Sequence, residues 1–228
     1  MKPKKPPNIS ARSSVCNLVL VCIPEMIPYP TCLHKMQSFT AARQDSTADE
    51  MWLVQHPEVY TLGVRGAGQP LAESIRRQTV QSDRGGLITW HGPGQIVLYW
   101  LADLRRLGIG PRVVVNALEG AVITFLASFG CVAKARVDAP GVYVDDQKIA
   151  SVGLRVRGGC SYHGIALNVN NDLSAFNAIA PCGLQGVRAT SCRALGIHLA
   201  PQEAGLRLVD WLSSRYYQNL HTSSRTFS

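Results

Sequence analysis

The sequence GVYVDDQKIASVGLRV, residues 141–156, decides how the fold is interpreted. Residues 142–144 and 149–156 are rich in β-branched and apolar side chains, and they flank the turn-forming pair Asp145 and Asp146. Two such runs around an Asp pair are typical of a β-hairpin, in which the strands are antiparallel. Residues 141–156 are therefore predicted to form a hairpin within a mostly antiparallel sheet.

Helices and further strands are predicted on both sides of this hairpin. The helices are expected where apolar side chains recur at helical intervals, and Gly130 is a suitable end for the second of them. The expected helices are residues 31–43, 113–129 and 203–212, with a short one capped by Asp172 and reaching 179, and the expected strands are 51–55 and 162–169. Strands interleaved with helices in this way indicate an α/β protein of the α+β type, a mixed sheet flanked by helices.

The composition is that of a folded protein. The chain has 228 residues, of which 46% are hydrophobic and 17% charged, which is enough for a hydrophobic core and excludes extensive disorder. No apolar stretch approaches the ~20 residues that a membrane span needs. A single domain is expected over residues 17–217, preceded by a basic mobile tail over 1–16 and followed by a short tail over 218–228.

Charge and cysteine content narrow the class of function. The 23 basic and 15 acidic residues give a net charge of +8, which favours an acidic partner. No helix-turn-helix, zinc-finger or RNA-binding strand pattern is present, so nucleic acid is not the expected partner. The seven cysteines include no CxxC pair, so neither a metal site nor a redox pair is predicted, and a reducing, cytoplasmic setting is expected.

Residues 84–95 read RGGLITWHGPGQ, in which a Gly-Gly pair precedes a short apolar strand and a Gly-Pro-Gly turn follows it. Glycine allows the backbone to approach a ligand closely, so this segment is a candidate pocket wall. A strand between two tight turns, without any ligand, is the alternative. The spacing matches neither of the glycine-rich phosphate-binding motifs, so a nucleotide site is not predicted here.

Lys148 begins the segment KIASVG, residues 148–153, directly after the hairpin turn. A lysine in such a place is most often a solvated turn residue. Here Ser151 and Gly153 follow on one face of the same strand, because alternate strand residues point to the same side. A strand face of small residues leaves room for a ligand, which makes Lys148 a candidate functional residue.

Cys182 lies between a proline and a glycine in the segment PCG, residues 181–183, a frame suited to presenting a nucleophile. Cysteine is more often a small buried hydrophobic residue, and Cys192 is a competing candidate without such a frame. His91 and His163 are candidate bases for a Cys–His pair. The residues alone leave open which cysteine reacts and which side chain activates it.

Taken together, these segments resemble the octanoyltransferases of lipoate biosynthesis, also called lipoyl(octanoyl) transferases. The segments occur in the same order and at compatible spacing, and the resemblance extends over about residues 17–195. It does not include the basic residues 1–16. The matching segments are RGGLITWHGPGQ (84–95), KIASVG (148–153), HGIALNVN (163–170) and PCG (181–183), together with ADEMWLVQHPEVYTLG (48–63).

The resemblance implies the fold of the biotin and lipoate ligases and the transfer of an octanoyl group. The donor would be octanoyl-acyl carrier protein, and the acceptor a lysine of a lipoyl domain, as in 2-oxoacid dehydrogenases and the glycine cleavage H protein. By position, Cys182 matches the cysteine that carries the acyl thioester, and Lys148 the lysine that lowers its pKa and acts as general base. No cofactor, metal, nucleic acid or membrane is implied. The matched substrate-binding residues are Arg84, Gly85, Gly86, Leu87, Ile88, Thr89, Trp90, His91, Ser151, Val152, Gly153, Gly164, Ile165 and Ala166.

Thiol and amine chemistry agree with these roles. A free thiol has a pKa of ~8.5, so only about 3% is thiolate at pH 7, and a nearby ammonium favours the thiolate. The acceptor lysine is almost fully protonated at pH 7, so the second step needs a base. Replacing one thioester by another, and then by an amide, requires no ATP, which agrees with the missing phosphate-binding motif.

Two alternative functions remain for this sequence. An ATP-dependent lipoate or biotin ligase on the same fold would form an acyl-adenylate and would not need Cys182. A non-catalytic basic module that binds carrier protein or nucleic acid would form no covalent adduct. Adenylate formation from ATP and octanoate, or a covalent octanoyl adduct on the protein, separates these functions.

Overall fold

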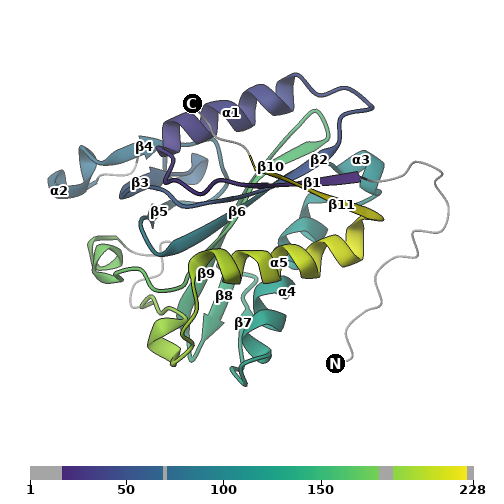
Figure 1. The fold of residues 1–228 in the computed structure, drawn as a ribbon. Coiled ribbons are helices and arrows are strands. Elements are labelled where there is room, and N and C mark those ends of the chain that lie inside the picture. The colour runs from purple at the N-terminus through teal and green to yellow at the C-terminus, as the bar shows by residue number, and fades with distance from the viewer. Residues whose placement is uncertain (1–16, 69–70, 180–186, 225–228) are drawn as a thin grey trace.

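The computed structural model describes residues 17–68, 71–179 and 187–224. A large sheet has the strand order β11-β1-β2-β6-β10-β9-β8-β7, and a small sheet, β4-β3-β5, lies beside it (Figure 1). The strands of the large sheet are β1 (Asn17–Cys22), β2 (Asp49–Val54), β6 (Gln95–Asp103), β7 (Lys134–Ala135), β8 (Gly141–Val144), β9 (Gln147–Arg157), β10 (Cys160–Asn168) and β11 (Asn219–Ser224). Those of the small sheet are β3 (Val59–Leu62), β4 (Thr79–Gln81) and β5 (Ile88–His91).

The helices are α1 (Tyr29–Ala41), α2 (Glu73–Arg76), α3 (Leu104–Leu107), α4 (Pro111–Ala127) and α5 (Pro201–Tyr216), with 3-10 turns at Val64–Gly66, Ser174–Ala178 and Arg193–Leu195. Helices α4 and α5 pack on one face of the large sheet, and α1 lies on the other (Figure 1). Each face has its own cluster of buried apolar side chains. The three long helices, the strands and this layered arrangement confirm the predicted fold class.

The central hairpin forms as the sequence predicts. Strands β8 and β9 are antiparallel, and the two turn residues Asp145 and Asp146 have φ angles of 45° and 62°. Aspartate tolerates this left-handed conformation because its short side chain can interact with the neighbouring backbone. In the part of the large sheet that runs from β2 to β7, all neighbouring strands are antiparallel. Strands β9 and β10 are neighbours there, so their small residues lie side by side.

The expected tail after residue 217 is a wrong prediction for residues 219–224. These residues form β11, which pairs in parallel with β1, while β1 also pairs in parallel with β2. The edge of β1 has backbone donors and acceptors that need partners, and β11 supplies them. The expected basic tail over residues 1–16 lies outside the described residues.

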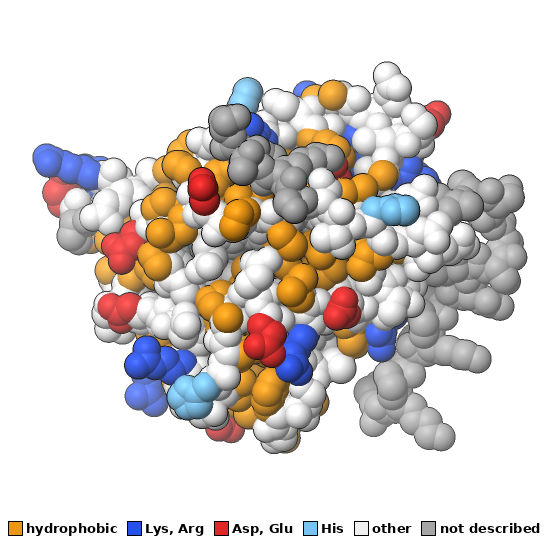
Figure 2. Space-filling model, viewed as in Figure 1, with side chains coloured by type: hydrophobic (Ala, Val, Ile, Leu, Met, Phe, Trp, Pro, Cys, Tyr) orange, Lys and Arg blue, Asp and Glu red, His pale blue; other side chains and the backbone are white. Residues whose placement is uncertain are grey.

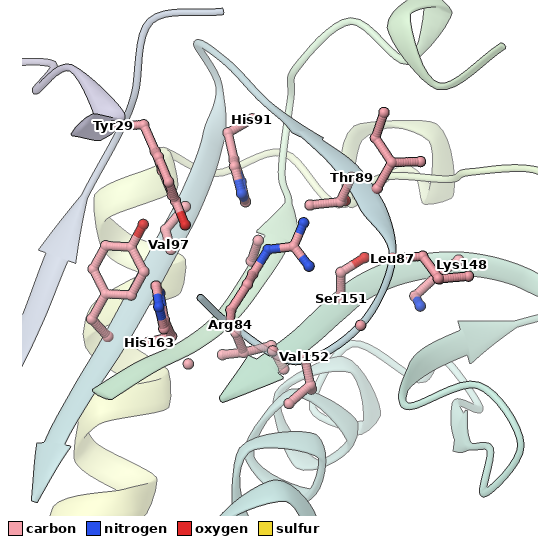
Figure 3. Close-up of a pocket in the computed structure, with 17 residues that line it drawn as sticks. Tyr29, Arg84, Leu87, Thr89, His91, Val97, Lys148, Ser151, Val152 and His163 are labelled. Carbon is pink, nitrogen blue, oxygen red and sulfur yellow. The ribbon is translucent and has the colours of Figure 1, made fainter. Parts of the chain in front are cut away.

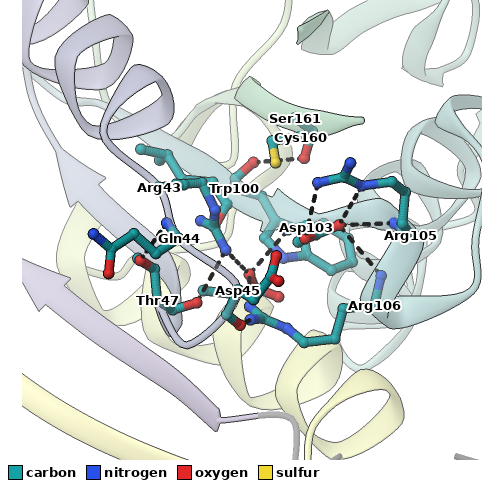
Figure 4. A network of polar contacts seen from close by, with 12 residues as sticks. Arg43, Gln44, Asp45, Thr47, Trp100, Asp103, Arg105, Arg106, Cys160 and Ser161 are labelled. Atoms are coloured by element: carbon teal, nitrogen blue, oxygen red, sulfur yellow. Dashed lines mark hydrogen bonds and ion pairs between the residues drawn. The ribbon is translucent and has the colours of Figure 1, made fainter. Parts of the chain in front are cut away.

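A buried polar network fastens α1 to the sheet (Figure 4). The carboxylate of Asp49 accepts hydrogen bonds from Arg43, from Arg106 and, at 3.0 Å, from the hydroxyl of Tyr217. Asp103 caps the short helix α3 by accepting from the backbone N–H groups of the two residues that follow Leu104. Buried charges require such partners. The network holds the end of α1 against the sheet, and the first residue of this helix, Tyr29, reaches the site described below.

On the face of the molecule that bears α5, neither the basic nor the acidic side chains gather into a patch. Basic and acidic side chains are intermixed there, with hydrophobic side chains between them (Figure 2). The positive excess of the sequence is therefore not collected into one patch among the described residues on this face. Within the described part of the chain, no helix has the length and apolar character required to cross a bilayer.

Candidate functional site

A pocket lies between the large sheet and the segment that leads into β5 (Figure 3). Its floor is made by the three adjacent strands β6, β10 and β9. Ala166 on β10 lies between Val97 on β6 and Ser151 on β9, and these three line the pocket from the same side of the sheet. The predicted small-residue face of β9 is thus confirmed, and β10 extends it.

Gly164 forms the next row of this floor, between Tyr99 and Gly153. A Cβ atom on Gly164 would collide with the carbonyl oxygen of Leu98 on β6. Only glycine permits the two strands to approach this closely at that point. Strand packing therefore explains the glycine in HGIALNVN. Because Gly164 has no side chain, the pocket floor is hollowed at this point.

Most of the predicted site residues come together in this pocket. Its lining includes Arg84, Gly86, Leu87, Ile88, Thr89, His91, Lys148, Ser151, Val152, Gly153, Gly164, Ile165 and Ala166. Among the predicted residues that the structure describes, Gly85 and Trp90 do not line it. The N–H of Gly85 donates to the carbonyl of Leu154 at 2.8 Å, so Gly85 fastens the segment to β9. Trp90 points to the other side of β5, where its ring packs against Phe176 at 5.6 Å.

Arg84 lies in the middle of the pocket wall with a buried guanidinium (Figure 3). Its Nη2 donates to the carbonyl oxygen of Thr61 at 2.6 Å and to the hydroxyl of Thr61 at 2.8 Å, and Nη1 donates to the carbonyl of Gly85 at 3.0 Å. These carbonyl and hydroxyl acceptors are themselves uncharged. The wall between the two ends of the pocket therefore carries a fixed positive charge.

Lys148 lies at one end of the pocket, opposite Tyr29 and His163 (Figure 3). The residue is only 3% exposed. Its ammonium donates to the carbonyl oxygen of Pro140 at 3.0 Å and lies 5.4 Å from the centre of the Tyr143 ring. Its buried position contradicts the simple expectation of a solvated turn lysine, because the strand carries the side chain inward past Gly141.

The structure describes Cys192 and Cys32 but not Cys182. Cys182 lies outside the described residues. Cys192 is fully buried beneath the sheet, on the side of α4 and α5, and burial raises the pKa of its thiol to about 12. A thiol with that pKa has almost no thiolate at neutral pH, so Cys192 is a structural residue and not a nucleophile. Burial likewise raises the pKa of Cys32 to about 12.

Two buried histidines, His91 and His163, line the other end of the pocket, and a third, His56, lies beside His91 with the ring centroids 5.8 Å apart. Hydrogen-bond partners fix the tautomers of His56 and His91. His56 donates from Nδ1 to the carbonyl of Ile27 at 2.6 Å and accepts at Nε2 from the hydroxyl of Tyr99 at 2.7 Å. His91 donates from Nδ1 to Gln95 at 2.7 Å, because the amide nitrogen of Gln95 donates elsewhere and leaves its oxygen as acceptor. Burial lowers the pKa of His56 to about 4 and that of His91 well below 6.5.

His163 differs from the other two because it combines a carboxylate partner with backbone strain. Its Nε2 donates to Asp83 at 2.8 Å, and Tyr162 and Gln37 also hydrogen-bond this carboxylate. Burial lowers the pKa of His163, and its φ angle of 65° is unusual for a non-glycine residue. Burial raises the pKa of Asp83, but these hydrogen bonds outweigh it and leave the pKa well below its usual range. The contacts fasten the RGG segment to β10.

These histidines predict a stability that falls with acid well before the carboxylates titrate. A histidine that is neutral in the folded protein, with a pKa of about 4 against about 6.5 when unfolded, contributes stability that is complete above pH 6.5 and is lost as the pH falls toward 4. His56 alone should lower the free energy of unfolding by roughly 2 kcal/mol between pH 7.5 and pH 5. Urea unfolding at the two pH values measures this loss.

The matched control is His34, which lies exposed on α1. The variant His34→Asn should keep the full pH dependence, while His56→Asn should lose much of it, whatever its stability at pH 7.5. An unchanged pH dependence in His56→Asn would contradict the assignment of a buried neutral imidazole.

Comparison with known proteins identifies the family. Residues 28–212 match the lipoyl protein ligase A/B catalytic domain. The octanoyltransferase of Halorhodospira halophila is 51% identical over 170 residues, which are 75% of this chain and 78% of the relative. The octanoyltransferase of Methylococcus capsulatus is 52% identical over 181 residues, 79% of this chain and 87% of the relative. The chain belongs to the octanoyltransferase family. It is therefore an acyltransferase, and the resemblance found in its four segments is confirmed.

Solved structures confirm the fold of this octanoyltransferase. Lipoate-protein ligase A bound with ATP superimposes with a TM-score of 0.74, covering 93% of this chain and 90% of the ligase, at 14% sequence identity. A putative lipoate protein ligase from Thermoplasma acidophilum with bound lipoic acid gives a TM-score of 0.72 with the same coverage and identity. At this identity the similarity shows the shared fold and leaves the reaction to be argued from the site.

Three pocket residues of the octanoyltransferase had no assigned role in the sequence analysis. They are Tyr29, Val97 and Tyr99. Val97 and Tyr99 alternate along β6, so the period of two in a buried strand is a signal that could have found them. Tyr29 comes from the start of α1, far away in the sequence, and no local pattern indicates its position. His163 was a candidate base, but its tie to Asp83 becomes visible only in the fold.

Proposed function

We propose that this octanoyltransferase takes an octanoyl group from octanoyl-acyl carrier protein, holds it as a thioester on Cys182 and passes it to a lysine of a lipoyl domain. The observation that carries the proposal is Lys148, a buried ammonium at one end of a pocket with a floor of small residues. Acyl transfer needs a charge near the thiolate and an apolar groove for the chain, and both meet at this position.

In the first half-reaction the thiolate of Cys182 attacks the carbonyl carbon of the donor thioester. The bond from this carbon to the donor sulfur breaks, and the carrier thiolate leaves and takes up a proton. The ammonium of Lys148 stabilises the Cys182 thiolate before the attack. The octanoyl chain lies along Ser151 and Ala166, where small side chains leave room for it.

In the second half-reaction the amine of the lipoyl lysine attacks the same carbonyl carbon. An amide bond forms, the bond to the Cys182 sulfur breaks, and one proton leaves the attacking amine. Lys148 takes this proton, because acylation has removed the thiolate that favoured its charged form. His91 and His163 are poorer bases, since burial lowers the pKa of each.

Two observations on described residues support Cys182 as the nucleophile. Burial raises the pKa of Cys22, Cys32, Cys160 and Cys192, which makes each of these thiols a weak nucleophile. The chain beyond Cys182 is fastened to the backbone of Lys148. The N–H of Lys148 donates to the carbonyl of Arg188 at 2.8 Å, and the N–H of Thr190 donates to the carbonyl of Lys148 at 3.0 Å.

The intact mass of the protein after mixing with octanoyl-acyl carrier protein tests this function. A gain of one octanoyl group, lost again when an apo lipoyl domain is added, is expected without ATP. Formation of octanoyl-adenylate from ATP and octanoate, with no adduct from the carrier thioester, would instead favour the ligase alternative. The high identity to octanoyltransferases already argues against that alternative.

The pocket floor should set the length of the acyl chain. In Ala166→Leu the added side chain occupies space that the octanoyl tail needs and displaces roughly three methylenes, at ~0.8 kcal/mol each. Octanoyl transfer should therefore weaken by about 2.4 kcal/mol, or roughly 60-fold, while a shorter pentanoyl donor should be little affected. The measurement is the ratio of acylation rates with the two donors.

The conservative variant Ala166→Ser serves as the control for this experiment, since it adds a single oxygen to the same Cβ and should retain the preference for octanoyl. If Ala166→Leu slows both donors equally, the chain does not lie over this position.

A further inference from the structure

Glu119 is a buried carboxylate without a role in the reaction described so far. It lies on α4, the helix that packs against β8 and β9, and is 6% exposed. Its Oε1 accepts a hydrogen bond of 2.7 Å from the backbone N–H of Gly141. Burying a carboxylate in an apolar layer costs free energy, so this buried position requires a compensating interaction.

The peptide group between Pro140 and Gly141 joins Glu119 to Lys148. In a trans peptide the C=O and N–H groups point in opposite directions. Here the N–H of Gly141 points to Glu119, while the carbonyl of Pro140 accepts from the Lys148 ammonium at 3.0 Å. A carboxylate at the N–H end of this peptide pushes electron density toward the carbonyl oxygen, and hydrogen bonds in such a chain strengthen one another.

The local backbone is built around this contact. Gly141 has a φ of 142°, and a Cβ atom there would lie 2.6 Å from Cε of Lys148 and collide with the carbonyl of Ala150. A glycine is therefore required for the lysine side chain to pass over the peptide. Tyr143 completes the support, since its hydroxyl donates to the carbonyl of Ala139 at 2.8 Å and its ring faces the ammonium.

We propose that Glu119 is a positioning residue for Lys148, which it holds through the Pro140–Gly141 peptide and whose protonated form it stabilises by its charge. The proposal rests on the proposed role of Lys148 in the transfer. Burial raises the pKa of Glu119, and the Gly141 N–H and the charge of Lys148 act against that rise, so the two groups interact electrostatically. Among the described residues, Tyr143 from β8 also lies against the lysine, and Arg84 lines the same pocket.

Two variants separate the charge of Glu119 from its reach. Glu119→Gln keeps an oxygen for the Gly141 N–H but removes the charge, so Lys148 should give up its proton more readily. The pH profile of transfer from pre-acylated enzyme to an apo lipoyl domain should then rise at a pH lower by roughly 1 unit. Glu119→Asp keeps the charge but is too short to hold the peptide. Its profile should stay in place while the plateau falls roughly 10-fold or more.

The control is Val122→Ala on the same helix, a buried residue of the apolar cluster. Val122→Ala should lower the melting temperature without moving the pH profile. If Glu119 had only a structural role, its variants should behave in the same way. A wild-type profile in Glu119→Gln, with transfer abolished in Lys148→Ala, overturns the positioning role alone. Normal transfer in Lys148→Ala overturns the proposed role of the lysine itself.

Discussion

Cys182→Ser is expected to abolish the octanoyl adduct and to lower turnover by roughly 10⁴-fold or more, as the loss of other catalytic nucleophiles does. A serine hydroxyl ionises far less readily than a thiol, so the ammonium of Lys148 cannot generate an effective nucleophile from it. The measurement is the intact mass of the variant after incubation with octanoyl-acyl carrier protein, followed by turnover with an apo lipoyl domain.

The matched control is Cys192→Ser. Because the Cys192 thiol is fully buried and its pKa is raised to about 12, the adduct should form at the wild-type rate wherever this variant folds. An adduct that persists in Cys182→Ser and disappears in Cys192→Ser would overturn the choice of nucleophile. Peptide mapping of the wild-type adduct gives an independent answer, since the two cysteines lie in different tryptic peptides: Arg188 separates them.

Lys148→Ala is expected to slow both half-reactions, and the second by roughly 10²- to 10⁴-fold, the usual contribution of a general base. Lys148→Arg separates the two tasks of the lysine. A guanidinium keeps the positive charge that favours the thiolate but does not release its proton, so it cannot serve as a base. The arginine variant should therefore retain part of the adduct formation and fail in the transfer to the lipoyl domain.

Single-turnover measurements of each half-reaction test this expectation. Normal transfer from a pre-acylated Lys148→Arg enzyme would show that the base lies elsewhere. The arginine must also fit over Gly141, where the lysine side chain already passes closely, so a loss of both half-reactions calls for a second measurement. The alkylation rate of Cys182 against pH then reports whether the charge still acts on the thiol.

The long elements and the hairpin were predictable from the sequence because their signals are local. The Asp145-Asp146 turn has residues that tolerate positive φ, and the helix over residues 111–127 has a strong apolar periodicity that ends shortly before Gly130. The strand β11 was missed because NLHTSS is polar and has few β-branched residues. Its partner β1, and not its own composition, makes it a strand.

The site was predictable where a segment itself carries the reason for its composition, as in the small residues Ser151 and Gly153. Trp90 lies away from the pocket because a strand alternates its side chains, and the match to a continuous motif does not distinguish the two faces of β5. Tyr29 and the bridge from Glu119 to Lys148 were not predictable, since both depend on contacts between elements distant in the sequence.

The pairing of β1 with β11 also bears on how the protein folds during synthesis. Asn17 and Asn219 lie side by side, although 202 positions separate them in the chain. A ribosome releases the N-terminal part first, so β1, β2, β6, β9 and β10 can assemble while the outer edge of β1 still lacks its neighbour. That apolar strand remains a template for other unfinished chains until residues 219–224 emerge. During synthesis the nascent protein therefore exposes a strand edge that the finished protein covers.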